Sequence, residues 1–224
     1  GGPTVGTGMT VDVQIWSDVA CPWCYVGKRR FEKAVERFRE EGGDVQVTYR
    51  SFELSPDTPV DFEGDEVDFL ARHKGMAREQ VVGMLAQMTQ VASDEGLDYD
   101  FGALQHTNTV LAHRLLHHAR AEGRQEEMKE RLLAAYFVEG RHVGRVDDLA
   151  DLAAEVGLDR DEVVAALSGD AYLEQVRSDQ EQAMALGIRG VPFFVLDDRL
   201  GVSGAQDPDT FLGALRRAAE EQPA

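Results

Sequence analysis

The chain has little cysteine, few basic residues and no long apolar run. Only two of its 224 residues are cysteine, so structural disulfides cannot hold it together. A chain of this length can bury a core without them. No stretch reaches the roughly 18 consecutive apolar residues that a membrane-spanning helix needs. The 23 Lys and Arg are outnumbered by 41 Asp and Glu. The net charge of −18 argues against nucleic acid or an anionic membrane as the main partner.

The N-terminus lacks the basic start and the apolar centre of a secretory signal. We expect residues 1–8 to form a flexible leader, with Met9 as a plausible natural start. With no signal visible, we expect a cytoplasmic protein in a reducing thiol environment. An exported protein whose signal had been removed would look the same, and the sequence leaves that alternative open.

The two cysteines lie close together, in the motif Cys21-Pro22-Trp23-Cys24. Alternating apolar and polar residues over 11–16 predict a strand before the motif. Apolar residues at helical spacing over 31–38 predict a helix after it. A cysteine in the first turn of a helix lies at the positive end of the peptide dipoles, which favours the thiolate. We therefore predict a redox-active dithiol in which Cys21 has a lowered pKa and attacks first.

Half of a structural zinc site is the alternative for two cysteines at this spacing. Such a site needs four ligands, and the chain has no second cysteine pair. The six histidines lie far from the motif in sequence. A disulfide across this motif closes only a very short loop, so it would contribute little stability. We favour redox chemistry, with no metal and no cofactor other than the disulfide itself.

The rest of the chain divides into extended ends and a helical middle. Alternation over 44–50 predicts a second strand, extended segments at 192–196 and 200–204 predict a β-hairpin, and a last helix is predicted over 208–220. The middle of the chain, from about residue 63 to 186, is expected to be almost entirely helical. Its predicted helices are 63–73, 77–95, 108–121, 124–138, 147–156, 159–168 and 170–186.

A proline opens the apolar segment Gly190-Val191-Pro192-Phe193-Phe194. Proline lacks an N–H and fits only at the start or the edge of a strand. Most peptide bonds before proline are trans. Because the chain also has the cysteine motif at a strand-to-helix junction, we nevertheless expect the Val191–Pro192 bond to be cis.

The order of these motifs resembles the thioredoxin-fold DsbA family. It runs from a strand through the cysteine motif, a second strand and a helical insertion to the Gly-Val-Pro segment, a hairpin and a last helix. Segments 17–27, 106–114 and 202–206 are similar to the FrnE-like branch of that family. The resemblance covers residues 9 to about 220.

The resemblance implies an α/β protein with a thioredoxin-like fold and a large all-helical insertion. Its thioredoxin-like domain is expected to be discontinuous, over 9–60 and 169–224, with the insertion at 61–168. The implied activity is that of a protein thiol-disulfide oxidoreductase, with Cys21 exposed and Cys24 more buried. The expected partners are proteins or peptides that carry thiols or disulfides, and an unidentified redox partner that recycles the pair.

The resemblance also assigns roles around the cysteines. Pro22 and Trp23 are expected to tune the reactivity of the pair. The cis Val191–Pro192 bond is expected to lie beside the disulfide, and the backbone of Val191 to pair with an extended substrate segment. The loop Ser203-Gly204-Ala205-Gln206 either borders that substrate groove or is a plain turn.

Two other functions share parts of this pattern. Kappa-class glutathione transferases and 2-hydroxychromene-2-carboxylate isomerases are similar in outline and use glutathione, but they generally have Ser where Cys21 stands. Glutathione is therefore a candidate thiol partner. A non-catalytic, chaperone-like module is the other alternative, because Met76, Met84 and Met88 could line an apolar groove. They are also compatible with an ordinary helix core.

Two histidines, His113 and His117, are four residues apart, a spacing that allows metal binding on one face of a helix. No acidic or cysteine ligand lies at matching spacing. We expect solvated histidines or buried histidines with polar partners at both positions.

Trp23 predicts the redox strength of the pair. Typical DsbA proteins have a His at this position that donates to the thiolate, whereas an indole offers only one N–H and bulk. We therefore expect a reduction potential below the value of about −120 mV that strong oxidants show. Equilibration of the protein in glutathione buffers of known composition measures it, and a value near −120 mV would contradict the expectation.

Overall fold

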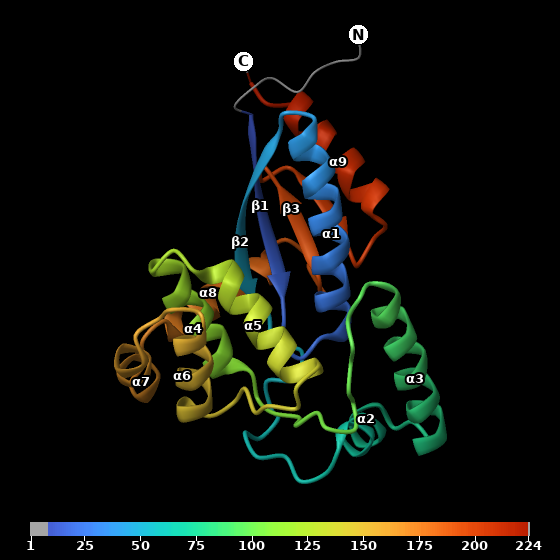
Figure 1. Cartoon of the computed structure of the whole chain (residues 1–224), viewed down its shortest axis with the longest axis vertical. Coiled ribbons are helices and arrows are strands. Elements are labelled where there is room, and N and C mark those ends of the chain that lie inside the picture. The colour runs from blue at the N-terminus through green and yellow to red at the C-terminus, as the bar shows by residue number, and fades with distance from the viewer. Residues whose placement is uncertain (1–8, 224) are drawn as a thin grey trace.

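The computed structural model describes residues 9–223 and is shown in Figure 1. The predicted leader, residues 1–8, lies outside the described residues. Four strands form one sheet in the order β2-β1-β3-β4. They are β1 (Thr10–Ser17), β2 (Asp44–Ser51), β3 (Phe193–Leu196) and β4 (Leu200–Ser203). β1 pairs parallel with β2 and antiparallel with β3, and β3 and β4 form the predicted hairpin.

The parallel pair is joined by α1 (Pro22–Glu40), as a crossover connection requires. The C-terminal helix α9 (Pro208–Glu220) lies beside α1 over the sheet (Figure 1). Both helices bury their apolar sides against the strands. The rings of Phe31, Phe194 and Phe211 meet at this interface, with centroids 4.6–5.4 Å apart. Aromatic clustering of this kind adds to the free energy gained by burying the rings.

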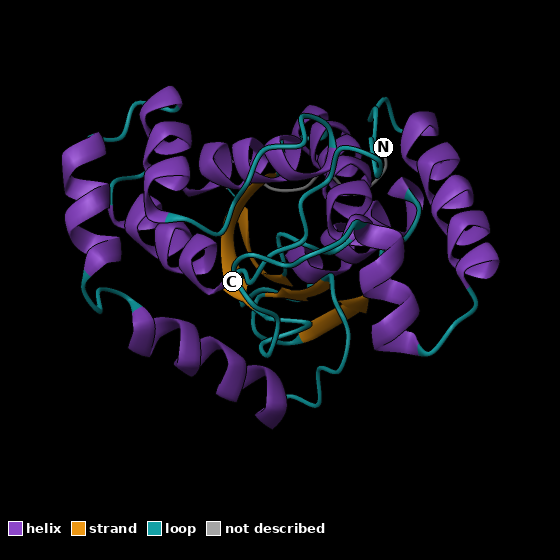
Figure 2. Ribbon diagram, turned by 90° about the horizontal axis from the view of Figure 1, so that it is seen from below, coloured by secondary structure: helices purple, strands orange, loops and turns teal. Residues whose placement is uncertain are grey.

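All seven predicted helices of the middle region are present, and each begins and ends within three residues of its predicted limit. Figure 2 shows helices surrounding the central sheet. In chain order the seven helices are α2 (Glu66–Lys74), α3 (Arg78–Asp94), α4 (Val110–Ala121), α5 (Gln125–Phe137), α6 (Val146–Glu155), α7 (Arg160–Ser168) and α8 (Leu173–Ala185). No helix within residues 9–223 is long and apolar enough to cross a membrane.

The helical region has a hydrophobic core of its own. Leucines of α4, α5 and α6, such as Leu115, Leu132 and Leu149, are fully buried in it. Tyr25 and Val26, from the first turns of α1, belong to the same cluster. The core of the insertion therefore extends to the start of the helix that follows the cysteine motif.

Buried hydrogen bonds connect α8 to the sheet and to α4. The Asp179 carboxylate accepts from the Ser51 N–H at 2.9 Å and lies 2.8 Å from His117 Nε2. The Asp179 carbonyl accepts from Trp16 Nε1 at 2.9 Å. His113 Nε2 lies 2.9 Å from Asp18 in the same way. Both histidines are thus buried with polar partners, one of the two outcomes that the sequence predicted, but their partners lie far away in sequence.

Because Asp179 joins three elements, we expect Asp179→Ala to lower the free energy of unfolding by about 3 kcal/mol. Removing a buried carboxylate leaves its hydrogen-bond partners, the Ser51 N–H and the His117 ring, without compensation. Urea unfolding followed by circular dichroism measures the loss. Asp209→Ala is the matched control, because that carboxylate is 84% exposed and should cost less than about 0.5 kcal/mol. Equal losses in the two variants would contradict the role of Asp179.

Candidate active site

The cysteine motif forms the junction between β1 and α1. Cys21 is the N-cap residue of α1, and Pro22 occupies its first turn, where the missing N–H is not needed. The Cys24 N–H donates to the Cys21 carbonyl at 3.0 Å. Both cysteines are free thiols. The predicted strand-to-helix placement of the pair is therefore present.

The sheet register brings the Gly-Val-Pro segment to the same place. Trp16, near the end of β1, pairs with Phe193 at the beginning of β3, so Pro192 lies level with the carboxyl end of β1. The Val191–Pro192 peptide bond is cis. The Cys21 thiol points toward the Val191 carbonyl, with 3.6 Å between sulfur and oxygen. Residues about 170 positions apart thus meet at the cysteine motif.

A glycine of α1 allows Pro192 to pack this closely. A Cβ atom at Gly27 would lie 3.0 Å from Pro192 Cγ and 3.3 Å from Ala205 Cβ. The Gly204 N–H donates to the Pro192 carbonyl at 2.9 Å. The loop over 203–206 therefore holds Pro192 against α1. Sequence reasoning did not identify Gly27, because a glycine inside a helix shows nothing of its distant neighbours.

The expectation that Cys21 is exposed is wrong for this structure. Cys21 is 5% exposed and Cys24 is 3% exposed, whereas Trp23 between them is 44% exposed. Cys21 is nevertheless part of the wall of a cavity, and Cys24 is not. A substrate would therefore reach Cys21 from this cavity.

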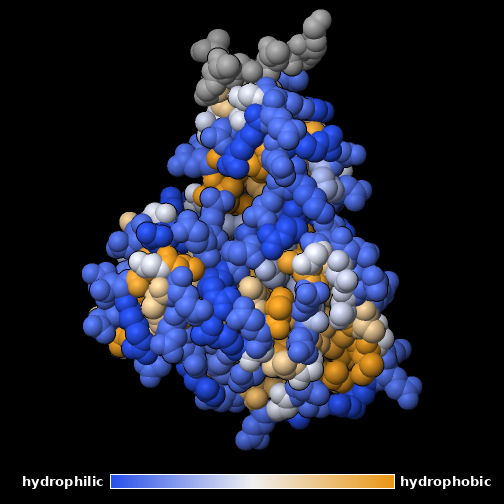
Figure 3. All heavy atoms as spheres, in the orientation of Figure 1, coloured by the Kyte–Doolittle hydropathy of each residue, from blue (hydrophilic) through white to orange (hydrophobic). Residues whose placement is uncertain are grey.

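The cavity has a volume of about 320 Å³ and lies between the cysteine motif and the insertion. Its walls are mostly apolar, and α3 also presents apolar surface to the outside (Figure 3). Met84 and Met88 belong to the wall, and Met76 does not. His106, to which the sequence assigned no role, lines the cavity with Nδ1 at 3.5 Å from Glu66 Oε2. The other apolar wall residues include Trp23, Phe69, Leu70, Leu85, Phe101 and Phe137.

A lysine that sequence reasoning missed is buried near the cysteines. Lys129 of α5 is 1% exposed, and its ammonium group has no hydrogen-bond partner within residues 9–223. The Nζ atom lies 5.3 Å from the centroid of the Tyr49 ring. Burial lowers the pKa of Lys129 to about 8, against an opposing attraction from Cys24 and Asp18. The sequence pattern that could have located Lys129 is its helical spacing from Leu132, Leu133 and Tyr136, which puts a lysine on an apolar helix face.

Ion pairs position α5 against α1. Glu130, next to Lys129, accepts from Lys28 Nζ at 2.8 Å and from Arg29 Nη1 at 3.0 Å. The Tyr25 hydroxyl also donates to Glu130. Burial by itself would raise the pKa of Glu130, but Lys28, Arg29 and Tyr25 hold it at about 2. These contacts of Glu130 hold the start of α1, which carries Cys24, close to Lys129 on α5.

The pKa values of the two thiols are shifted in directions that the sequence did not predict. The hydrogen bond with Cys24, together with burial, raises the pKa of the Cys21 thiol. Burial acts against ionisation of Cys24 as well, but the hydrogen bond from Cys21 and the charge of Lys129 lower the pKa of Cys24 below its ordinary value. The expected lowered pKa of Cys21 is therefore wrong here. The hydrogen bond between the thiols and the charge of Lys129 both favour the first thiolate on Cys24.

The chain matches the DsbA-like thioredoxin domain family over residues 12–216. It belongs to this family. A probable DsbA oxidoreductase from Streptomyces coelicolor is 42% identical, with a TM-score of 0.89 over 96% of this chain and 92% of the other. The chain is therefore a thiol-disulfide oxidoreductase with the predicted thioredoxin-like fold and helical insertion.

Two further proteins are similar over most of the chain. The uncharacterized protein YwbO of Bacillus subtilis is 31% identical over 209 residues, which cover 92% of this chain and 96% of YwbO. The 2-hydroxychromene-2-carboxylate isomerase structure shares only 16% identity but has a TM-score of 0.67 over 94% of this chain and 97% of its own. This likeness concerns the fold alone. The FrnE-like branch stays a prediction.

The burial of Lys129 predicts a variant that is more stable than the natural protein. Between pH 8 and 10.5 the unfolded chain keeps a proton on Lys129 that the folded chain loses. The contribution of Lys129 to the free energy of unfolding therefore rises with pH in this range. Below pH 8 the penalty is constant and on the order of 3 kcal/mol. We expect Lys129→Met to remove this penalty and the pH slope, as measured by urea unfolding. Lys33→Met, at a residue 51% exposed, is the control and should change neither.

The same variant should make Cys24 less acidic, because the cation that favours its thiolate is lost. The pH dependence of thiolate absorbance in the reduced protein measures this change. An unchanged titration curve in Lys129→Met would show that the lysine does not act on Cys24.

Proposed function

We propose that this protein exchanges disulfides with protein or peptide substrates through Cys21 and Cys24, beside the cis Val191–Pro192 bond. The observation that carries the proposal is the position of the Cys21 sulfur. It lines the cavity and lies 3.6 Å from the Val191 carbonyl, where an extended substrate can approach. Cys24 is buried and is not part of the cavity wall.

In the oxidising direction, a substrate thiolate attacks Cys21 Sγ. A bond forms between the substrate sulfur and Cys21, the Cys21–Cys24 bond breaks, and the electron pair leaves on Cys24. A second substrate thiolate then attacks the substrate sulfur of this mixed disulfide and releases Cys21 as a thiolate. The substrate loses two electrons, and the enzyme gains them as a dithiol. The same steps in reverse reduce a substrate disulfide.

Lys129 supports the part that Cys24 plays in both directions. A thiol of lower pKa leaves faster when a disulfide is attacked. The charge of Lys129 lowers the pKa of Cys24, so it stabilises this sulfur as the leaving group. In reverse, the thiolate on Cys24 is the nucleophile that resolves the mixed disulfide. Cys21 is the sulfur that is attacked because it lines the cavity, whereas its raised pKa makes it the slower leaving group in the second step.

Val191 is proposed to hold the substrate backbone. No hydrogen bond to its N–H occurs within residues 9–223, and its carbonyl meets only the Cys21 thiol among the described side chains. Both groups can therefore pair with an extended peptide by strand addition. The half-exposed Trp23 and the adjoining Pro22 form the surface that such a peptide would cover on the other side of Cys21.

The disulfide itself carries the electrons in this proposal, without a bound cofactor, and glutathione or a protein thiol recycles it. The cytoplasmic location that the sequence suggested stays a prediction.

A glutathione-dependent enzyme that acts on an apolar electrophile is the second candidate. The specific observation in its favour is the apolar cavity beside Cys21, in a fold shared with 2-hydroxychromene-2-carboxylate isomerase. Such an enzyme needs no second cysteine. Glutathione-dependent conversion of an aromatic electrophile that survives in Cys24→Ser would favour this candidate over disulfide exchange.

Reduction of insulin disulfides by a thiol-driven assay tests the proposal. We expect Cys21→Ser to reduce the rate to the uncatalysed background, because the remaining sulfur, on Cys24, is not part of the cavity wall. Cys24→Ser should instead accumulate a mixed disulfide with a peptide substrate, since the resolving sulfur is missing. Mass spectrometry of the digested complex locates the bond. A mixed disulfide on Cys24 in Cys21→Ser, formed as fast as on Cys21 in Cys24→Ser, would contradict the assigned roles.

A further inference from the structure

His118 of α4 is a buried histidine with a ring nitrogen that lacks a partner. His118 is 8% exposed, and its Nε2 atom makes no hydrogen bond within residues 9–223. A buried polar atom that lacks a partner is costly, and most such atoms in folded proteins are satisfied. His113 and His117, on the same helix, each have a carboxylate partner. His113 Nδ1 also lacks a partner, but the other nitrogen of that ring is bound to Asp18, whereas His118 has no carboxylate partner within residues 9–223.

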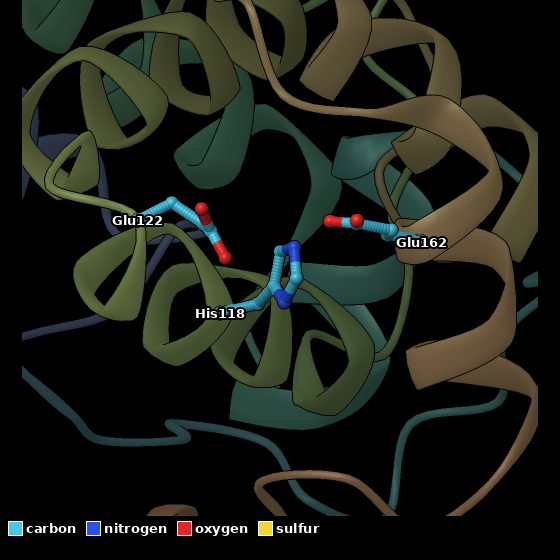
Figure 4. Close-up of side chains that lie close together, drawn as sticks. All are labelled: His118, Glu122 and Glu162. Carbon is cyan, nitrogen blue, oxygen red and sulfur yellow. The ribbon is translucent and has the colours of Figure 1, made fainter.

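The free nitrogen faces two carboxylates. Glu122 follows His118 by one turn at the C-terminal end of α4, and Glu162 comes from the first turn of α7. In Figure 4 the imidazole of His118 points into the space between the two carboxylates. One ligand atom from each of the three residues lies within 4.8 Å of the others. The three donors thus converge from two helices that are separate in sequence.

The nearby cationic side chains pair with other carboxylates. Arg124 pairs with Glu127, and Arg160 pairs with Asp151. Within residues 9–223, no Lys or Arg lies within ion-pair distance of Glu122 or Glu162. Two carboxylates and an imidazole nitrogen therefore share this space without a Lys or Arg side chain from residues 9–223. The excess of acidic residues in the whole chain adds to the attraction for a cation.

We propose that His118, Glu122 and Glu162 bind a divalent transition-metal ion, Zn²⁺ being the best match. An imidazole nitrogen with two carboxylate oxygens is a donor set that Zn²⁺ accepts, whereas Mg²⁺ and Ca²⁺ prefer oxygen alone. Zinc bonds of about 2.0–2.2 Å require the donors to close in by about 1 Å. The side chains of Glu122 and Glu162 can make this movement because both residues are exposed.

Such an ion would join the end of α4 to the start of α7. The Glu162 side chain is free for this role, because the N-cap of α7 uses the Asp159 carboxylate and the Glu162 N–H. An ion held by both helices binds the folded chain and not the unfolded one, so it stabilises the insertion. Three protein ligands leave a fourth position for water.

Zinc binding to the Cys21→Ser/Cys24→Ser double variant tests the proposal, since the reduced dithiol could itself bind zinc. Isothermal titration calorimetry with ZnCl₂ should show one site. The Tm should rise by about 5 °C at a hundredfold excess over Kd. MgCl₂ should leave the Tm unchanged. Absence of zinc binding in the double variant, or an equal response to MgCl₂, would overturn the proposal.

Substitutions in the same background identify the ligands. Glu162→Gln should weaken zinc binding at least tenfold without disturbing the fold, because the residue is exposed. His118→Gln should have at least the same effect. Glu174→Gln, at a carboxylate of α8 that is 83% exposed and paired with Arg177, is the matched control. Unchanged affinity in Glu162→Gln and His118→Gln would show that any bound zinc lies elsewhere.

Discussion

The register between β1 and β3 is the constraint on which the active site depends. Because the two strands are antiparallel and Trp16 pairs with Phe193, the residue before β3 must lie at the carboxyl end of β1. That residue is Pro192. The turn after β1 carries Cys21, and α1 must start there in order to cross over to the parallel strand β2. Gly27 and the loop at Ala205 then allow Pro192 to approach α1 closely. A shift of this register by one residue would also turn Phe194 out of the core.

The helical insertion supplies part of the cavity wall beside the cysteines and a charged group that acts on them. Its helices α2 and α3 supply five of the apolar wall residues, so Cys21 faces a shaped cavity and not an open surface. Its helix α5 brings Lys129 to Cys24. A buried lysine without a hydrogen bond reduces stability, and here it lowers the pKa of Cys24, the proposed leaving group. The protein thus retains a destabilising group at the place where its charge is useful, as active sites often do.

Two predictions about the cysteine pair, the acidity and the exposure of Cys21, are wrong because groups distant in sequence decide them. A cysteine at a helix N-terminus is favoured as a thiolate by the peptide dipoles, and this argument pointed to Cys21. It did not include the hydrogen bond between the thiols or a cation from a helix more than a hundred residues away, and both favour Cys24. The exposure of Cys21 was implied by the family resemblance, and it is wrong here because Cys21 is buried beside a cavity whose wall includes residues of α2 and α3.

The sequence by itself determined the elements and the motif chemistry. Apolar spacing along a helix or strand is a local property, and it located the seven helices of the middle region, the strands of the sheet and the strand-to-helix junction at the Cys-Pro-Trp-Cys motif. Only the tertiary structure decided which distant groups meet: Asp179 with His117, Lys129 with Cys24, and His118 with Glu162. Such pairs depend on how helices pack against one another. Burial then sets the strength of their electrostatic interactions, and neither quantity can be read from the spacing of residues along the chain.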